Sequence, residues 1–255
     1  MKTMLRPLLS LAVLVAAASS LTAGSAKKKI ALYDDAGSGG AGIPSVQKIL
    51  DSEVKLETVT AEQIRAGGLA GYDAVIFTGG SGSKQSESLQ PAGIDEVRKF
   101  VENGGGYMGI CAGAYLACDG FSWSARMLNA KTVSQKWRRG KGNVEMELTD
   151  EGKKILGEFQ EPLLIKYNNG PIIKVAGNDL PDFMPLAYFR TEMAENETPA
   201  GVMVNTPAIV ASTFGKGRLI TISPHPEQTD GLAEMVKRAA EWVATPDAAP
   251  VAAAK

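Results

Sequence analysis

Short apolar runs alternate with amphipathic segments along the first half of the chain. The runs contain many β-branched and aromatic residues and end at glycines or small residues, which is typical of strands buried on both faces. The segments between them repeat apolar residues at helical spacing. This alternation predicts an α/β fold with a mostly parallel central sheet and helices on both of its faces. The expected strands are Lys29–Asp34, Val54–Val59, Tyr72–Thr78 and Tyr107–Ile110, and the expected helices are Ile43–Leu50, Ala61–Ala66 and Pro91–Asn103.

The second half of the chain has a different pattern. Its apolar pieces are short and follow one another closely, which indicates additional short antiparallel strands. Gly215-Lys216-Gly217 separates two of these pieces by a turn short enough for a hairpin. The expected strands are Val144–Leu148, Leu163–Tyr167, Ile172–Val175, Leu186–Phe189, Ile209–Phe214 and Arg218–Ser223, and Leu232–Val243 is the expected closing helix.

The two ends of the chain differ from its middle. Residues 1–26 carry Lys2 and Arg6, then an apolar stretch, then small residues up to Ala26, which is the pattern of a cleaved signal peptide. We therefore expect a periplasmic or secreted protein with one domain over residues 27–244. The remainder, 245–255, is rich in Ala and Pro and is expected to be disordered. No other segment is long and apolar enough to suggest a membrane contact after cleavage.

The net charge bears on the kind of partner. The formal charge of the whole chain is −1, and loss of the two basic residues in the signal peptide lowers it to −3. Nucleic-acid binding normally requires a basic surface, so nucleic acid is not an expected partner. A small molecule or a peptide is the expected ligand.

The chain has two cysteines, Cys111 and Cys118, on what is expected to be a single turn and helix. Two helical turns separate them by about 10 Å, which exceeds the usual Cα reach of a disulfide. Two free thiols are therefore expected in spite of export. Cys118 is expected to pack in the core, as free cysteines commonly do.

Cys111 has the sequence surroundings of a nucleophile. It directly follows an expected strand, and the single histidine of the chain, His225, lies two residues before Glu227. A histidine can take the proton of a thiol, and a carboxylate can hold the histidine in the required tautomer. Residues two apart on an extended segment point to the same side. Cys111, His225 and Glu227 are therefore the candidate catalytic residues.

Small residues on both sides of Cys111 fit a tight turn from strand to helix. Gly109 and Gly113 would relieve backbone clashes in such a turn. The helix that follows would point its amino end toward the sulfur and favour a thiolate. The N–H group of Ala112 is then a candidate oxyanion donor.

Ligands of parallel α/β sheets bind beyond the carboxyl ends of the strands. Cys111 and His225 both follow expected strands, and so do Gly79 and Gly80. A glycine lets the backbone approach a substrate closely, so this pair is expected to supply the second oxyanion donor. An ordinary strand-to-loop turn explains the same two glycines.

Two motifs carry a family resemblance. Gly109-Ile110-Cys111-Ala112-Gly113 and His225-Pro226-Glu227 resemble the nucleophile elbow and the His-Pro-Glu motif of class I glutamine amidotransferases. The chain is more similar still to the amidotransferase-like domain at the amino terminus of some biotin–protein ligases and in stand-alone bacterial proteins. That resemblance rests on residues 33–42, 100–115 and 167–171, and the matching order of elements extends from about Lys29 to Val243.

The resemblance implies a flavodoxin-like three-layer sandwich. It also implies that Cys111 is the nucleophile, that His225 is the base and that Glu227 orients it. Gly80 and Ala112 would form the oxyanion hole.

One position departs from the family pattern. Glutamine-hydrolysing members commonly carry Gln four residues after the cysteine, where this chain has Tyr115. This departure argues against glutamine as the substrate. Tyr115 is a candidate for lining the pocket of another ligand, with Gly79 and Tyr167 as further substrate-binding candidates; core packing is the alternative for Tyr115.

Other ligand classes find little support. The chain has one histidine and no close pair of cysteines, so neither a metal site nor a metal cofactor is expected. The glycines near residues 37–42 are not followed by Gly-Lys-Ser/Thr, as a phosphate-binding loop would require. A basic cluster around Trp137 fits either contact with an anionic substrate or a solvated hairpin; it consists of Lys136, Arg138, Arg139 and Lys141.

Export narrows the possible activities. An amidotransferase passes ammonia to a synthetase partner at the expense of ATP, which an exported protein lacks, so no ATP-dependent synthetase partner is expected. The leading hypothesis is a hydrolase that attacks an amide, ester or peptide carbonyl through a thioester at Cys111. Two alternatives remain: a non-catalytic module that binds a small molecule or a partner, and a thiol sensor, since a thiolate is easily oxidised.

Overall fold

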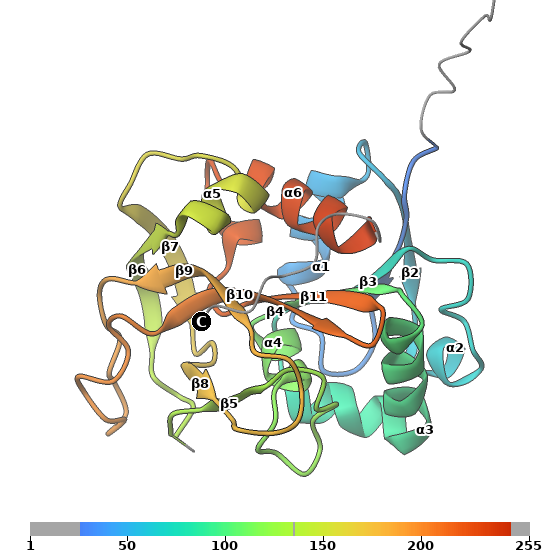
Figure 1. Ribbon diagram of the computed structural model, residues 1–255, viewed down its shortest axis with the longest axis horizontal. Helices are drawn as coiled ribbons and strands as arrows, with labels where there is room; N and C mark the ends of the chain where they lie inside the picture. Colours follow the sequence, from blue (N-terminus) through green and yellow to red (C-terminus); the bar gives the residue numbers. More distant parts are fainter. Residues whose placement is uncertain (1–25, 135, 246–255) are drawn as a thin grey trace, which may run out of the picture.

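The computed structural model describes residues 26–134 and 136–245 of the chain (Figure 1). Residues 1–25 of the expected signal peptide and 246–255 of the expected tail lie outside the described residues. A nine-stranded sheet runs through the described part. In spatial order its strands are β2 (Lys55–Val59), β1 (Lys29–Tyr33), β3 (Ala74–Phe77), β4 (Gly106–Ile110), β11 (Gly217–Ile222), β10 (Pro207–Phe214), β9 (Met184–Phe189), β6 (Lys141–Leu148) and β7 (Leu163–Asn168).

The first five strands of this order, from β2 to β11, pair in parallel. Their registers bring all five carboxyl ends to one edge of the sheet, as the alternation in the sequence predicts. β3 pairs with β1 from Ala74 opposite Ile30, and β4 pairs with β11 up to Ile110 opposite Ile222. The loops that leave β1, β3, β4 and β11 therefore start close together.

The antiparallel strands extend the same sheet. β10 and β11 form the expected hairpin, with Phe214 opposite Gly217, and β9, β6 and β7 follow by antiparallel pairing. A separate two-stranded sheet consists of β5 (Ala130–Thr132) and β8 (Ile173–Val175). β5 is not among the strands expected from the sequence.

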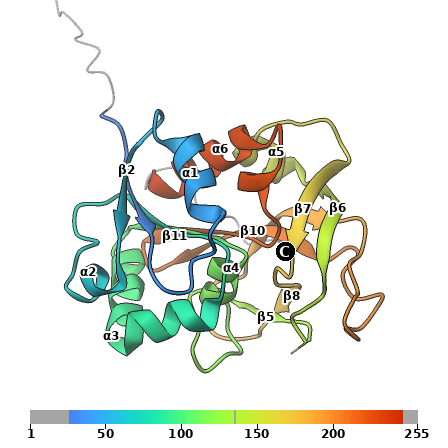
Figure 2. The same cartoon turned by 180° about the vertical axis from the view of Figure 1, so that it is seen from behind.

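Helices cover both faces of the sheet (Figures 1 and 2). Successive strand residues point to opposite faces, so Ile30 and Leu32 belong to one buried cluster and Ala31 and Tyr33 to the other. One face is covered by α1 (Gly42–Leu50), α5 (Asp150–Leu156) and α6 (Ala233–Ala244), and the other by α2 (Ala61–Arg65), α3 (Gly82–Glu102) and α4 (Ala112–Ala117). This is the flavodoxin-like three-layer sandwich expected from the sequence.

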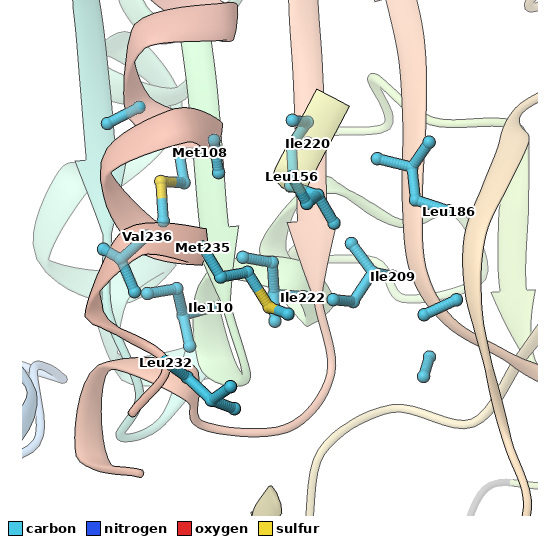
Figure 3. Close-up of a cluster of buried hydrophobic side chains, with 14 of the residues drawn as sticks. Met108, Ile110, Leu156, Leu186, Ile209, Ile220, Ile222, Leu232, Met235 and Val236 are labelled. Carbon is cyan, nitrogen blue, oxygen red and sulfur yellow. The ribbon is translucent and has the colours of Figure 1, made fainter. Parts of the chain in front are cut away.

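The packing of α6 shows how the core joins the two halves of the sheet (Figure 3). Met235 and Val236 of this helix face Met108 on β4 and Ile222 on β11, and all four side chains are fully buried. The same cluster continues to Ile209 on β10. The parallel strands, which bear the site, are therefore held against a rigid layer of apolar side chains.

α3 begins well before the expected residue. The sequence predicts a helix from Pro91, whereas the structure extends α3 from Gly82 and interrupts it at Gln90, whose φ and ψ are 58° and 171°. Residues 82–90 are mostly polar and show little apolar periodicity, so the pattern does not reveal this first part. Ser81 caps it by accepting a hydrogen bond from the Lys84 N–H group at 3.4 Å. Its amino end lies beside the pocket described below.

Within residues 26–134 and 136–245, none of the helices has both the length and the apolar character that a bilayer crossing requires.

Candidate active site

A pocket of about 380 Å³ opens at the carboxyl edge of the parallel strands. Cys111 after β4 and His225 after β11 both line it, as do Gly79 and Gly80 after β3. Gly39 and Gly40 in the loop after β1, and Gly42 at the start of α1, also line it. The structure thus brings together at one cavity the groups that the sequence placed at the ends of separate strands.

Cys111 occupies a sharp turn between β4 and α4. Its φ and ψ are 50° and −95°, a conformation that L-residues rarely adopt, and strained backbone of this kind is common at functional sites. The Cys111 N–H group donates to the Ile222 carbonyl oxygen at 2.8 Å and anchors the turn to β11. A Cβ atom at Gly113 would lie 2.3 Å from the Phe77 carbonyl oxygen, so the turn requires the glycine that the sequence supplies.

His225 and Glu227 contact each other directly. Nδ1 of His225 lies 2.8 Å from Oε1 of Glu227, and both side chains are buried. The expected contact exists, but the expected extended backbone is wrong. His225 instead precedes a short 3-10 turn, Pro226–Gln228, and this turn brings the two side chains together. Gln228 donates from Nε2 to the same carboxylate oxygen at 2.8 Å.

Gly79 packs closely against His225 and near Cys111. A Cβ atom there would lie 2.7 Å from Cε1 of His225 and 3.7 Å from Cβ of Cys111. The position of the histidine ring therefore requires glycine at residue 79.

The thiol and the imidazole are not hydrogen-bonded to each other in this state. The Cys111 thiol donates to the Asn168 carbonyl oxygen at 3.4 Å, and Nε2 of His225 has no hydrogen-bond partner among the described residues. Burial disfavours the imidazolium, but the Cys111 sulfur and the Glu227 carboxylate outweigh it and raise the pKa of His225 to about 10. The site therefore favours a proton on His225 when the sulfur is charged.

The oxyanion candidates lie on the same pocket. Ala112 is the first residue of α4, where N–H groups have no acceptor within the helix. Gly80 has a φ of 138°, and a Cβ atom there would lie 2.0 Å from the Gly37 carbonyl oxygen, so only glycine fits. The bridge between Ser38 and Gly80 uses hydrogen bonds from Gly39 N–H and Ser81 N–H and leaves the Gly80 N–H out.

The two tyrosine candidates have different positions. Tyr115 lines the pocket, and its hydroxyl donates to the Asn169 carbonyl oxygen at 3.1 Å. Burial raises the pKa of Tyr115 well above its usual range, which keeps the phenol neutral. Tyr167 is fully buried, donates to the Gly170 carbonyl oxygen at 2.7 Å and does not line the pocket. The structure therefore gives Tyr167 a packing position in place of the expected substrate contact.

An aromatic wall forms a further part of the pocket lining, and Trp123 of this wall lies against Gly82. Phe121 and Trp123 stack with ring centroids 4.7 Å apart, and Tyr115 meets Phe121 edge-on at 6.0 Å. Phe121, Trp123 and Trp137 all line the pocket. Sequence reasoning missed Phe121 and Trp123 because they follow α4 in a loop, where spacing does not reveal direction.

The basic cluster near Trp137 divides between the surface and the interior. Lys136 is exposed and donates to the Glu197 carbonyl oxygen at 3.0 Å. Arg139 is buried: Nη2 donates to the Pro199 carbonyl oxygen at 3.0 Å and lies 3.7 Å from Glu192. Nε and Nη1 of Arg139 have no acceptor among the described residues. Trp137 lines the pocket, and the four basic residues around it are not among the lining residues.

Both cysteines are free thiols, as expected, but their surroundings differ. Cys118 is fully enclosed, and burial raises its pKa to about 12. Only Cys111 of the two lines the main pocket. Cys118 therefore serves as an internal control for the reactivity of Cys111.

Comparison with known proteins supports the fold. Residues 29–138 match the family model described as "Biotin-protein ligase, N terminal". A chain in the structure of PurLQS from Thermotoga maritima has a TM-score of 0.61 at 15% identity, covering 85% of this chain and 97% of that one. A structure described as a glutamine amidotransferase has a TM-score of 0.55 at 20% identity, covering 83% and 98%.

A ThuA-like protein from Bacteroides uniformis has a TM-score of 0.55 at 18% identity, covering 87% of this chain and 93% of that one. No curated protein sequence matches the chain significantly. At these identities the structural neighbours establish the fold alone. The family match covers β1 to the loop after β5 and includes Cys111.

Proposed function

We propose that this glutamine amidotransferase-like domain, of the biotin–protein ligase N-terminal type, hydrolyses an amide, ester or peptide carbonyl through a thioester at Cys111. The fold and the family match support this assignment. One observation supports the proposed reaction most directly. A cysteine on a strained turn and a histidine held by a carboxylate at 2.8 Å line the same pocket.

The first half of the reaction forms the thioester. The Cys111 thiolate attacks the carbonyl carbon, and the carbonyl oxygen becomes an oxyanion. The bond from that carbon to the leaving nitrogen or oxygen then breaks, and Nε2 of the His225 imidazolium gives its proton to the leaving group. Glu227 stabilises the imidazolium and fixes the ring through Nδ1.

The second half consumes water. Neutral His225 takes a proton from a water molecule, whose oxygen attacks the thioester carbon. The C–S bond breaks, the acid product leaves and the thiolate–imidazolium pair is restored. In both halves the backbone N–H groups of Ala112 and Gly80 donate to the oxyanion, each contributing by hydrogen bonds that tighten as charge develops.

Residues 1–26 are part of the same proposal. They direct export, and the mature domain, residues 27–244, works outside the cytoplasm without an ATP-dependent synthetase. The sequence of the first residues supports this. Amino-terminal sequencing of protein recovered from the periplasm or medium should begin at Lys27; an intact Met1 in a membrane fraction would contradict export.

Reaction with p-nitrophenyl acetate tests the thioester step. We expect a burst of one p-nitrophenolate per protein molecule, because acylation of Cys111 precedes slower hydrolysis. The burst should disappear in Cys111→Ala and persist in Cys118→Ala, whose buried sulfur is replaced by a small apolar side chain. A burst that survives Cys111→Ala would overturn the proposal. So would its absence from a folded wild-type protein, which would leave a binding module or a thiol sensor.

A further inference from the structure

The chemical character of the pocket narrows the class of substrate. Asp, Glu, Lys and Arg are all missing from the side chains that line it in the described part of the chain, and His225 is the ionisable base that faces it. The polar lining consists of neutral groups such as Ser81, Asn168 and Gln228. Apart from the Cys111–His225 pair, which the proposed reaction itself uses, the described lining offers no ionised side chain, so a further charge on the ligand would lose its hydration without compensation. The lining therefore favours an uncharged ligand.

The pocket lining combines two kinds of surface. Its glycines leave backbone without side chains, and Phe121 and Trp123 present a stacked pair with rings 21° from parallel. Both aromatic side chains are partly exposed, so the pair is not closed off within the core. Aromatic rings favour offset or edge-on contact with a further ring at centroid distances of about 4.5–7 Å.

The pocket is large enough to hold a compact organic ligand with an aromatic ring. At about 380 Å³ it falls within the range of cavities, roughly 300–1,000 Å³, that enclose compact organic ligands. Trp137 lines it while remaining 48% exposed, so further aromatic surface is present at the opening. An aromatic group therefore has both room and a stacking surface beside the reactive sulfur.

The buried cation Arg139 has partners outside the pocket lining. It lies 3.7 Å from Glu192, donates to the Pro199 carbonyl oxygen and is not a lining residue. Glu192 therefore partly compensates its charge. The alternative to test is an anionic ligand, which would bind more tightly than an uncharged one if the positive charge of Arg139 acted within the cavity.

We propose that the site accepts an uncharged amide or ester bearing an aromatic ring, which stacks on Phe121 and Trp123 while its carbonyl faces Cys111. This inference deepens the proposed hydrolysis and rests on it for the chemical step. The recognition it describes is separable from turnover, because an alkylating reagent that carries the same ring also has to enter the pocket.

Iodoacetamides with different substituents test the inference. The rate constant for alkylation of Cys111 is measured with iodoacetamide and with four derivatives. Two are uncharged, the aromatic N-benzyl and the non-aromatic N-cyclohexylmethyl reagent, and two are charged, the N-(4-carboxybenzyl) and N-(4-aminomethylbenzyl) reagents. Each rate constant is divided by that of the same reagent with N-acetylcysteine, which corrects for intrinsic reactivity. We expect the N-benzyl reagent to exceed iodoacetamide by about tenfold, a size consistent with aromatic stacking plus apolar burial. The cyclohexyl reagent and both charged reagents should lose most of this gain.

Variants of the aromatic wall provide the matched control. Phe121→Leu and Trp123→Leu should each reduce the ratio of the N-benzyl rate to the iodoacetamide rate, because each removes one ring of the stacked pair. Equal rates with all reagents, or faster reaction of the carboxybenzyl reagent, would overturn the inference. An aromatic preference without a p-nitrophenolate burst would support the inferred recognition and contradict the proposed hydrolysis. A burst without any aromatic preference would support the hydrolysis and contradict the recognition.

Discussion

Glu227→Gln is expected to lower the rate of Cys111 alkylation at pH 7 by about 10- to 30-fold. Without the carboxylate the imidazolium no longer stabilises the Cys111 thiolate, and a free cysteine with a pKa of ~8.5 is only about 3% ionised at that pH. The carboxylate accepts from Nδ1 of His225 at 2.8 Å and from Gln228. A carboxamide is neutral and has one acceptor oxygen where the carboxylate has two. It no longer stabilises the imidazolium, and its NH2 group can force the wrong histidine tautomer. The measurement is the second-order rate with iodoacetamide.

Two controls accompany this variant. The size of the side chain is unchanged, and an unaltered thermal unfolding midpoint would separate a chemical effect from loss of the fold. Gln228→Ala removes one donor to the same oxygen but leaves the negative charge of Glu227 beside Nδ1 of His225. It should therefore lower the rate by clearly less than Glu227→Gln does, by about threefold or less. Equal rates for wild type and Glu227→Gln would show that the carboxylate does not act on the thiol.

Gly113→Ala is expected to destabilise the protein by about 3 kcal/mol, at the upper end of typical overpacking costs. The new methyl group would lie 2.3 Å from the Phe77 carbonyl oxygen, which belongs to the backbone of β3 and cannot turn aside. Either α4 moves away from the sheet or β3 shifts. In a domain of this size the unfolding midpoint should fall by roughly 6–12 °C, as measured by circular dichroism.

Gly40→Ala is the matched control for this change. No heavy atom lies within 4 Å of a Cβ atom at Gly40, so its stability should change by less than about 0.5 kcal/mol. A Gly113→Ala protein as stable as wild type would mean that the turn at Cys111 is not as closely packed as the structure has it.

The parallel part of the fold is predictable from sequence because its information is local. Strands such as Ala74–Phe77 and Gly106–Ile110 are buried on both faces and therefore read as continuous apolar runs. Cys111 and His225 follow two of these runs, and the topology of a parallel sheet brings such ends together. The location of Cys111 and His225 at one cavity could therefore be predicted from the strand pattern alone.

Other features were not predicted, for two different reasons. α5 is short and polar, so its apolar periodicity is weak, although two local signals could have revealed it: the Thr149 cap and Gly157, which ends the helix with a φ of 98°. The contact between His225 and Glu227 was expected from two-residue spacing, but a 3-10 turn produces it. Tyr167 was expected in the pocket and is buried beside Phe189. The directions of these side chains depend on tertiary packing, which spacing does not encode.

The pH dependence of Cys111 alkylation by iodoacetamide, followed in wild type and in His225→Ala with Cys118 as the internal control, tests the central claim most directly. The pKa of His225 is raised to about 10, so its positive charge should persist from pH 6.5 to 9. If His225 and Cys111 form the proposed pair, that charge stabilises the thiolate, and the wild-type rate should change by less than about threefold over this range. His225→Ala should instead show the rise of a free thiol, on the order of 50-fold over that range. Cys118 should stay unmodified until the protein unfolds. Superimposable profiles for wild type and His225→Ala would contradict a working Cys-His pair.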